Sequence, residues 1–480
     1  MFSDIQNYDF YKGVIYTMEK KEVRPFGIKD KMGYLFGDFG NDFTFILSSS
    51  FLLKFYTDIM GVNAAVVGLV MMIARFVDAF TDVAMGRICD RTKPGKNGKF
   101  RPWIRRMCGP VAIASFLIYQ SSLAGMPMGF KIAYLFVTYI LWGSVFYTSI
   151  NIPYGSMASV ISAEPDDRQS LSSFRTMGGM FAGMIISIGV PLVAYDTLAN
   201  GDVVLNGGRF TLIAGVFSVL AVGCYLLCYS LTTERVIPEV DEAKFKNNSV
   251  GTMLKNAVTN RALISIIAAS VVMLLAQLTQ QSMAGYVYPN YYRNATAQSM
   301  SSLAMMGGMI VAAALAKPLA RKLGKAELSV VSNLFAGAVG VILFFVRPAN
   351  VWVFVALQCL CWLGLGIFSM ICWALITDVI DDAELRNGIR EDGSVYALYS
   401  FARKLGQALS AGLTGALLSL IGYTTETAFS TPVTEGIFNI STLVPALGFI
   451  LLAAILWFWY PLHKKTVDEN VRKLKALHNK

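Results

Sequence analysis

Charged residues are scarce in this sequence. Only 15% of its 480 residues are Asp, Glu, Lys or Arg, whereas 55% are hydrophobic. A soluble domain of average composition carries about 25% charged residues. A soluble protein this apolar would expose large hydrophobic patches to water and would aggregate. Lipid is therefore the expected solvent for much of the chain.

Histidine is almost absent, since His463 and His478 in the C-terminal tail are the two that occur. No histidine is therefore available in the apolar part of the chain as a proton relay or a metal ligand. The seven cysteines show no zinc-site spacing with histidine. No Gly-x-x-x-x-Gly-Lys loop occurs, so we expect no nucleotide to drive the protein. No basic stretch has the features of a nucleic-acid binder, and we expect neither a nucleic-acid partner nor a cofactor.

Long apolar runs dominate what is present. A membrane-spanning helix needs about 20 mostly apolar residues, and about twelve such runs can be counted. They cover residues 32–56, 64–88, 103–124, 131–155, 168–195, 209–231, 262–288, 298–316, 327–346, 350–376, 395–421 and 438–461. The runs do not alternate in polarity over ~10-residue segments, as barrel strands would. The sequence predicts an all-α membrane protein surrounded by lipid.

Lys and Arg residues indicate the orientation of these helices. If residues 1–31 form a cytoplasmic segment, the inner segments hold thirty-two of the 41 Lys and Arg residues, and the outer loops hold four. Both termini are therefore expected in the cytoplasm, at a cell membrane. The longest polar inner loop divides the helices into two sets of six. The predicted parts are 1–31, an N-terminal bundle 32–231, a cytoplasmic loop 232–261, a C-terminal bundle 262–461 and a cytoplasmic tail 462–480.

The second apolar run contains ionisable residues, which are costly in a membrane and favour a functional role. Arg75, Asp78 and Asp82 are spaced three and four residues apart, which places them on one helix face with Thr81 nearby. Two neighbouring carboxylates repel each other and will bind a cation or keep a proton. Sodium prefers oxygen ligands such as these. The alternative is a structural ion pair with Arg75 or Lys404.

Polar residues also interrupt the first and fourth runs. Asp38 and Asp42 share one face of the first predicted helix, where they could bind sugar hydroxyls or merely line a wet cavity. Thr148 and Asn151 share a face of the fourth. Pro153 is expected to kink or break that helix, which is tolerated beside a cavity.

The loop after the second run has the spacing Gly-x-x-x-Asp-Arg, formed by Gly86, Asp90 and Arg91. This spacing resembles the gating loop of the major facilitator superfamily. Such a loop is a hinge and charge latch and performs no chemistry, so we interpret these three residues as gating residues.

Several longer motifs together resemble the glycoside–pentoside–hexuronide:cation symporter family. They are 34–42 (YLFGDFGND), 75–82 (RFVDAFTD), 98–103 (GKFRPW), 138–143 (TYILWG), 151–154 (NIPY), 390–393 (REDG) and 403–408 (RKLGQA). They occur in matching order from Gly33 to about Tyr423. The resemblance implies the major facilitator fold, with twelve transmembrane helices in two six-helix halves, and symport of a sugar with a cation by alternating access.

The resemblance also implies roles for individual residues. Asp78 and Asp82 would bind the coupling cation, assisted by Thr148, with Thr81 beside them. The candidate sugar-binding residues are Asp38, Asp42, Asn151, Arg175, Tyr399 and Lys404. No metal is expected other than a sodium ion at Asp78 and Asp82.

Three positions depart from a melibiose-transporting member of that family, which has Asn at position 81, Asp at 151 and an aromatic residue at 155. Here these positions hold Thr81, Asn151 and Gly155. The first change leaves sodium and proton coupling both open. The other two argue against galactoside specificity and resemble the glucuronide and pentoside transporters of the family.

Two other classes of function were weighed. A membrane-embedded enzyme would need a nucleophile, a general base or a metal site, for which the sequence offers no motif. A non-transporting sensor or scaffold would carry an added soluble domain, and the tail after Leu462 is short. The sequence therefore predicts a transporter of a small sugar or glycoside.

Overall fold

Long helices form almost the whole of the molecule. The computed structural model describes residues 24–95, 97–236, 260–387 and 392–478. The first set of helices is α2 (Ile28–Asp58), α3 (Ala64–Arg91), α4 (Arg101–Ile118), α5 (Met128–Ile140) continued by a π-helix η2 (Leu141–Tyr147) and α6 (Thr148–Ile161), α7 (Pro165–Ala194) and α8 (Gly207–Leu231). A short 3-10 helix, η1 (Ser121–Leu123), joins α4 to α5.

The second set repeats this plan. It comprises α10 (Arg261–Tyr286) continued by the π-helix η4 (Val287–Tyr291), α11 (Ala295–Leu323), α12 (Lys325–Val346), α13 (Val351–Asn387), α14 (Asp392–Leu420) and α15 (Thr431–Ala454) continued by η5 (Ile455–Trp459). A final helix, α16 (Lys464–His478), lies in the predicted cytoplasmic tail. The predicted all-helical architecture is confirmed. The helix ends lie within about seven residues of those expected, except that α13 continues to Asn387, well beyond the predicted end at 376.

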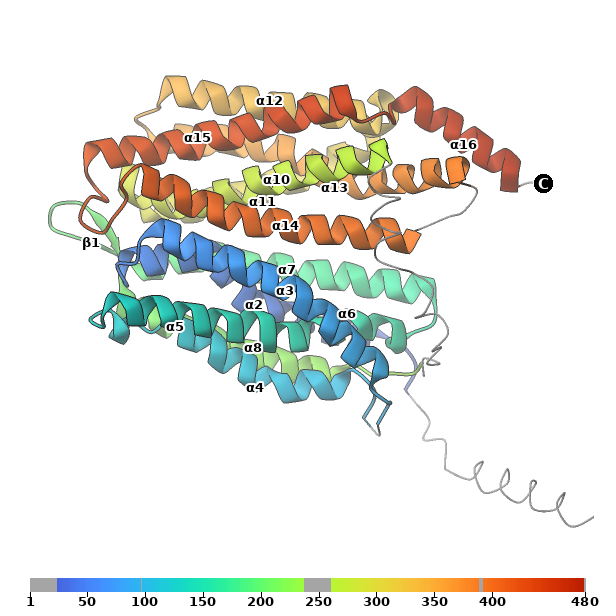
Figure 1. The fold of residues 1–480 in the computed structure, drawn as a ribbon, viewed down its shortest axis with the longest axis horizontal. Coiled ribbons are helices and arrows are strands. Elements are labelled where there is room, and N and C mark those ends of the chain that lie inside the picture. The colour runs from blue at the N-terminus through green and yellow to red at the C-terminus, as the bar shows by residue number, and fades with distance from the viewer. Residues whose placement is uncertain (1–23, 96, 237–259, 388–391, 479–480) are drawn as a thin grey trace, which may run out of the picture.

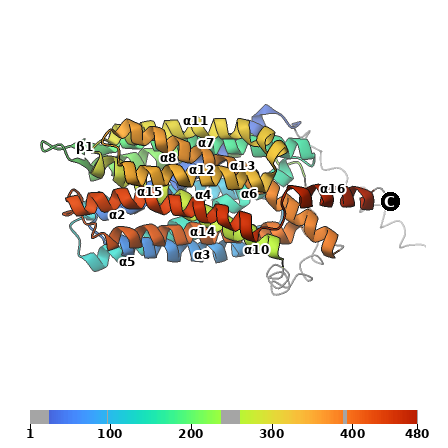
Figure 2. The same ribbon diagram turned by 90° about the horizontal axis from the view of Figure 1, so that it is seen from above.

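The helices run side by side along one axis (Figures 1 and 2). A small antiparallel hairpin, β1 (Tyr195–Thr197) with β2 (Val203–Leu205), lies at one end, and α16 projects at the other. We call these the hairpin end and the α16 end. Tyr195 pairs with Leu205 in the register of this hairpin, which the sequence did not predict.

Nine of the described helical segments are long and apolar enough to cross a membrane. The other long helices are α2, α4 and α14. They pack against helices of the apolar group: α2 contacts α7 and α8, α4 contacts α8, and α14 contacts α3 and α10. The chain is thus a multi-pass membrane protein in which these three helices join the same bundle.

The two sets meet along three helix pairs, α3 with α14, α7 with α11, and α2 with α10. Glycine makes the first contact possible near the hairpin end. A Cβ atom added to Gly68 would lie 2.7 Å from the carbonyl oxygen of Ala411, and one added to Gly415 would lie 2.4 Å from that of Ala64. The backbones of α3 and α14 can approach this closely because neither position carries a side chain.

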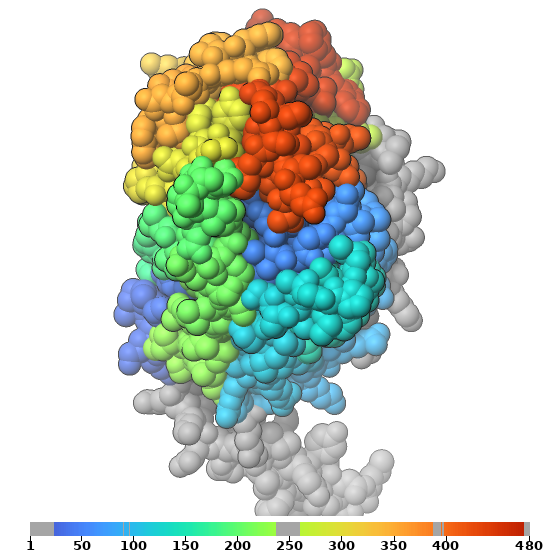
Figure 3. Space-filling model, turned by 90° about the vertical axis from the view of Figure 1, so that its left-hand side faces the viewer, coloured from blue at the N-terminus to red at the C-terminus, as the bar shows by residue number. Residues whose placement is uncertain are grey.

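A buried polar cluster, which we call the hairpin-end latch, also joins the two sets. Lys54 of α2 forms an ion pair with Asp58 at 2.8 Å, and its Nζ donates hydrogen bonds to Asn290 Oδ1 at 2.6 Å and to Tyr423 Oη at 2.9 Å. Tyr423 in turn donates to Asp58 at 2.7 Å. Figure 3 views this end, where orange atoms of the second set lie against blue and green atoms of the first. The latch therefore ties α2 to the second set.

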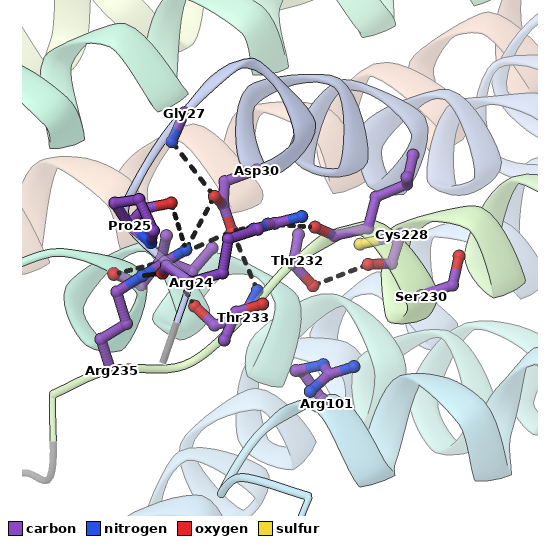
Figure 4. Close-up of polar contacts among 12 residues, drawn as sticks. Arg24, Pro25, Gly27, Asp30, Arg101, Cys228, Ser230, Thr232, Thr233 and Arg235 are labelled. Carbon is purple, nitrogen blue, oxygen red and sulfur yellow. Dashed lines mark hydrogen bonds and ion pairs between the residues drawn. The ribbon is translucent and has the colours of Figure 1, made fainter. Parts of the chain in front are cut away.

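A different cluster fixes the α16 end of the first set (Figure 4). The fully buried carboxylate of Asp30, at the start of α2, pairs with Arg24 and with Arg235, each at 2.9 Å. It also accepts a hydrogen bond from the backbone N–H of Thr233 at 3.0 Å. Because Thr233 and Arg235 follow α8, this cluster holds the end of the sixth helix against the start of the first. Most of the two predicted cytoplasmic segments 1–31 and 232–261 lies outside the described residues.

Candidate functional site

Each of the two carboxylates of α3 accepts a hydrogen bond from a hydroxyl group of the neighbouring helix, which runs through α5, η2 and α6. Ser144 Oγ donates a hydrogen bond to Asp78 Oδ1 at 2.5 Å, and Thr148 Oγ1 donates to Asp82 Oδ1 at 2.9 Å. Thr148 was predicted at this position, whereas Ser144 was missed. The structure therefore brings four oxygen-bearing side chains together on adjoining faces of two helices.

The two carboxylates also have cationic partners. Arg75 Nη1 lies 3.2 Å from Asp78 Oδ2, and the Arg75 guanidinium stacks over the Phe45 ring at 4.9 Å. Lys404 Nζ forms an ion pair with Asp82 Oδ2. Both ion pairs that the sequence offered as a structural alternative are thus present. The second of them joins α3 of the first set to α14 of the second set.

A π-helix positions the hydroxyl donors. The segment Leu141–Tyr147 has the wider i→i+5 turn, which is rare and often found at functional sites. Gly143 in this segment faces Asp78: a Cβ atom added there would lie 3.3 Å from Asp78 Oδ1. The sequence predicted an irregularity at Pro153, but α6 continues through Pro153 and the irregular turn lies earlier, directly beside the carboxylates.

The Thr81 hydroxyl donates a hydrogen bond to neither the Asp78 nor the Asp82 carboxylate in the described structure. Its hydroxyl donates to the backbone carbonyl of Asp78 at 3.1 Å, within its own helix. Its oxygen keeps lone pairs that could bind a cation.

The predicted sugar-binding residues of the first set lie close to one another. Arg175 Nε is 3.0 Å from Asp38 Oδ1, and its guanidinium lies over the Tyr154 ring at 5.2 Å. Asn151 accepts a hydrogen bond from Asn41 at 3.3 Å. Asp42 has neither a hydrogen bond nor an ion pair within the ranges that the structure describes. It is therefore the acidic group most available to a ligand.

Gly179 makes room for both acids of α2. A Cβ atom added at this position of α7 would lie 2.6 Å from Asp42 Oδ2 and 3.0 Å from Asp38 Oδ2. Any larger side chain would displace these carboxylates.

A cavity of about 710 Å³ lies between the two sets of helices. Asp42 and Arg75 line it, together with polar side chains of the second set such as Gln281, Gln407 and Thr414. Its volume falls within the range of ~300–1,000 Å³ that is usual for ligand pockets. Asp42 is the one sugar-binding candidate that lines it, so the cavity connects this acid to the second set.

Tyr399 lies apart from the other candidates. Its side chain is fully buried, its hydroxyl accepts hydrogen bonds from Ser270 at 3.1 Å and from Arg403 at 3.5 Å, and it lies 2.9 Å from Cys372 Sγ. All three neighbours belong to the second set, and Tyr399 does not line the central cavity. The structure therefore does not bring it to Asp42.

The predicted gating residues lie at the α16 end of α3. Arg91 belongs to the last turn of this helix and is exposed. A Cβ atom added to Gly86 would meet nothing within 4 Å. Asp90 lies in the same turn as Arg91, and its side chain is outside the described part of the chain. The gating role of these three residues stays a prediction.

Comparisons with known proteins agree with this architecture. Residues 33–464 match the family model described as MFS/sugar transport protein. An uncharacterized symporter of Bacillus subtilis, YjmB, is 31% identical over 94% of this chain and 96% of its own length. A glucuronide carrier protein homolog of Escherichia coli is 29% identical over 92% and 94%. The crystal structure of a D-xylose-proton symporter has the same fold, with a TM-score of 0.61 at 13% identity over 90% of this chain and 97% of that one.

The family model covers most of the chain, and the relatives match it nearly from end to end. The predicted resemblance and the prediction that the protein is no enzyme are both confirmed. The chain belongs to the MFS/sugar transport protein family, and it is a sugar transporter of the major facilitator superfamily.

Proposed function

We propose that this transporter is a symporter that couples the movement of a sugar or glycoside to that of a sodium ion or a proton. The observation that carries the proposal is the cluster of Asp78, Asp82, Ser144 and Thr148, in which two carboxylates and two hydroxyls converge. Oxygen atoms in this arrangement suit a hard cation, and the carboxylates alone suit a proton. The α16 end faces the cytoplasm of a cell membrane in this proposal, because the Lys and Arg residues are concentrated there.

Lys404 gives the cluster a means of coupling. Its ammonium group comes from the second set of helices and neutralises Asp82 of the first. A cation bound at Asp82 competes with Lys404 for the same carboxylate. Binding of the cation therefore loosens one ion pair between the two sets, and the two sets must move relative to each other during alternating access. A ligand shifts such an equilibrium only through its different affinity for the two states.

The sugar binds in the central cavity, where Asp42 accepts hydrogen bonds from its hydroxyl groups. The charge of the substrate is inferred from the cations at and near the cavity. Arg75, which lines the cavity, pairs with Asp78. Arg175 pairs with Asp38, and Lys404 pairs with Asp82. Because these three cations already have carboxylate partners, the arrangement favours an uncharged sugar. To bind an acidic sugar, Arg175 would have to break its ion pair with Asp38. Because the chain is similar to a glucuronide carrier homolog, glucuronides are tested as the alternative substrates.

The test is uptake by proteoliposomes that contain the purified protein. A panel of neutral glycosides and glucuronides is offered under an imposed sodium gradient and, separately, under a pH gradient. We expect one gradient to drive at least one sugar above its equilibrium concentration. Asp82→Asn is expected to abolish this accumulation and to retain exchange of the sugar without a gradient. If the unmutated protein brings every sugar only to its equilibrium concentration under both gradients, the proposed coupling is wrong.

A further inference from the structure

A second, smaller pocket adjoins the central cavity on the side of the hairpin-end latch. It measures about 60 Å³ and shares Ser187, Gln281, Ser302 and Met305 with the larger cavity. Its other walls are Ser50, Phe51, Gln280, Ala284, Val287, Tyr288, Gln298, Ser301, Phe354, Gln358, Trp362 and Ser441. We call it the glutamine pocket. The two pockets are therefore neighbours that share part of their walls.

The glutamine pocket is polar but carries no charged side chain. Four of its walls are glutamine amides, which both donate and accept hydrogen bonds, and five are serine hydroxyls. Phe51, Phe354 and Trp362 supply aromatic surface between them. A few placed polar groups among apolar and aromatic walls are typical of sites for small uncharged ligands.

Two of the amide oxygens lack a partner within the described residues. Gln280 and Gln298 are each 6% exposed, and the Oε1 atom of each has no hydrogen bond within the described part of the chain. The Nε2 atom of Gln280 does donate to Gln358 Oε1, so Gln280 is held in place while its acceptor remains open. Buried polar atoms are nearly always satisfied, and those that are not need an explanation. A ligand that donates hydrogen bonds would provide it.

The pocket also spans the two sets of helices. Ser50 of α2 and Ser187 of α7 belong to the first set, and the glutamines belong to the second. Gln281 Nε2 donates to Ser50 Oγ at 3.2 Å across the boundary. A ligand bound here contacts both sets at once, and its binding can therefore bias their relative position.

We infer that the glutamine pocket is a subsite for the hydroxyl groups of an uncharged sugar ring, with Gln280 and Gln298 as acceptors. This inference rests on the proposed transport of a sugar and specifies which part of the substrate the second set holds. One water molecule needs about 10–15 Å³ of cavity volume. The pocket, at about 60 Å³, therefore has room for roughly four waters or for the hydroxyl-bearing edge of one sugar ring. In the absence of sugar, water satisfies the two amides.

Binding to the purified full-length protein tests the inference, with methyl β-D-glucopyranoside and methyl β-D-xylopyranoside as probes and calorimetry as the readout. Gln280→Leu and Gln298→Leu keep the size of the side chain and remove its hydrogen bonds. Each is expected to raise the Kd of the probe that binds by roughly tenfold or more. Gln277→Leu is the matched control, since Gln277 lies one turn earlier on α10 and lines neither cavity. It should change the Kd less than twofold.

Monodeoxy analogues of the same probe identify the contact. If Gln280 accepts from one hydroxyl, removal of that hydroxyl and Gln280→Leu will not weaken binding additively. Melting temperatures report whether each variant folds. If Gln280→Leu does not fold, Gln298→Leu alone tests the inference.

Three outcomes would overturn the inference. Unchanged Kd values in both variants would show that the pocket holds water only. Transport of a glucuronide by a parent protein that binds neither neutral probe would overturn the subsite and leave the proposed function intact. A parent protein that moves no sugar of the panel would overturn both.

Discussion

Asn290 is expected to hold the hairpin end closed, and Asn290→Ala should open it. In the hairpin-end latch the buried Lys54 ammonium donates to Asn290 Oδ1 at 2.6 Å, with exposed fractions of 1% for Lys54 and 2% for Asn290. The two residues belong to different sets of helices, so this bond exists only while the sets are together. Asp58 keeps its ion pair with Lys54 in the variant, because both lie on α2.

The size of the effect follows from the charge on the donor. A hydrogen bond to a charged group contributes about 1.5–3 kcal/mol. The variant loses this free energy from the closed conformation alone, which corresponds to a shift of roughly 10- to 150-fold toward the open one. A conformation populated at about 1% would thereby become readily detectable.

Spin-label distances can measure this shift. Labels at Met128 and Thr431, which begin α5 and α15 at the hairpin end of opposite sets, report the separation, after replacement of the seven free cysteines. Asn439→Ala is the matched control, because Asn439 also accepts from a cation, Arg347 at 2.8 Å, but within one set. An unchanged distance distribution in Asn290→Ala, or an equal change in Asn439→Ala, would refute the reasoning.

The remaining predictions concern the two sites. Asp78→Asn should abolish gradient-driven accumulation as Asp82→Asn does, while sugar exchange persists; full accumulation in both variants would exclude these residues as the coupling site. Thr81→Asn adds an amide carbonyl and should shift coupling from protons toward sodium, measured as the ratio of uptake under the two gradients; a strict sodium requirement of the parent protein at every pH would contradict this. A matched glucoside should compete with a transported probe at least as well as the glucuronide, and Asn151→Asp should weaken the glucuronide further; better competition by the glucuronide would instead indicate an acidic substrate. Gly179→Ala should weaken sugar binding about tenfold by displacing the two acids of α2, and Gly189→Ala, which meets nothing within 4 Å, is its control.

The fold could be predicted because its main determinant is local. A run of apolar residues long enough to cross a membrane identifies a helix without any knowledge of its neighbours. The same is true of charge: the spacing of Asp78 and Asp82 places them on one face of α3 wherever that helix lies. Sequence reasoning therefore found the acids and the helices that carry them.

The partners of those acids depend on packing, which the spacing does not encode. Ser144 is one of many serines in apolar runs, and only the contact of η2 with α3 brings it to Asp78. Gln280, Gln298 and Gln358 are far apart in sequence and converge only when α10, α11 and α13 assemble. Tyr399 shows the opposite case, since it lies near Lys404 in sequence but contacts Ser270 and Cys372.

The π-helix at Leu141–Tyr147 has a consequence for how this chain can diverge from its relatives. A residue advances an α-helix by about 100°, and a wide turn holds about one residue more than a regular turn. If substitutions made this turn regular without loss of a residue, everything after it would rotate by about that amount. Thr148 would then turn away from Asp82, and Asn151 would leave Asn41. Loss of one residue together with the wide turn would instead keep the later residues in phase. A one-residue gap in this segment, when two such sequences are aligned, therefore predicts a regular helix that still presents the same faces to α2 and α3.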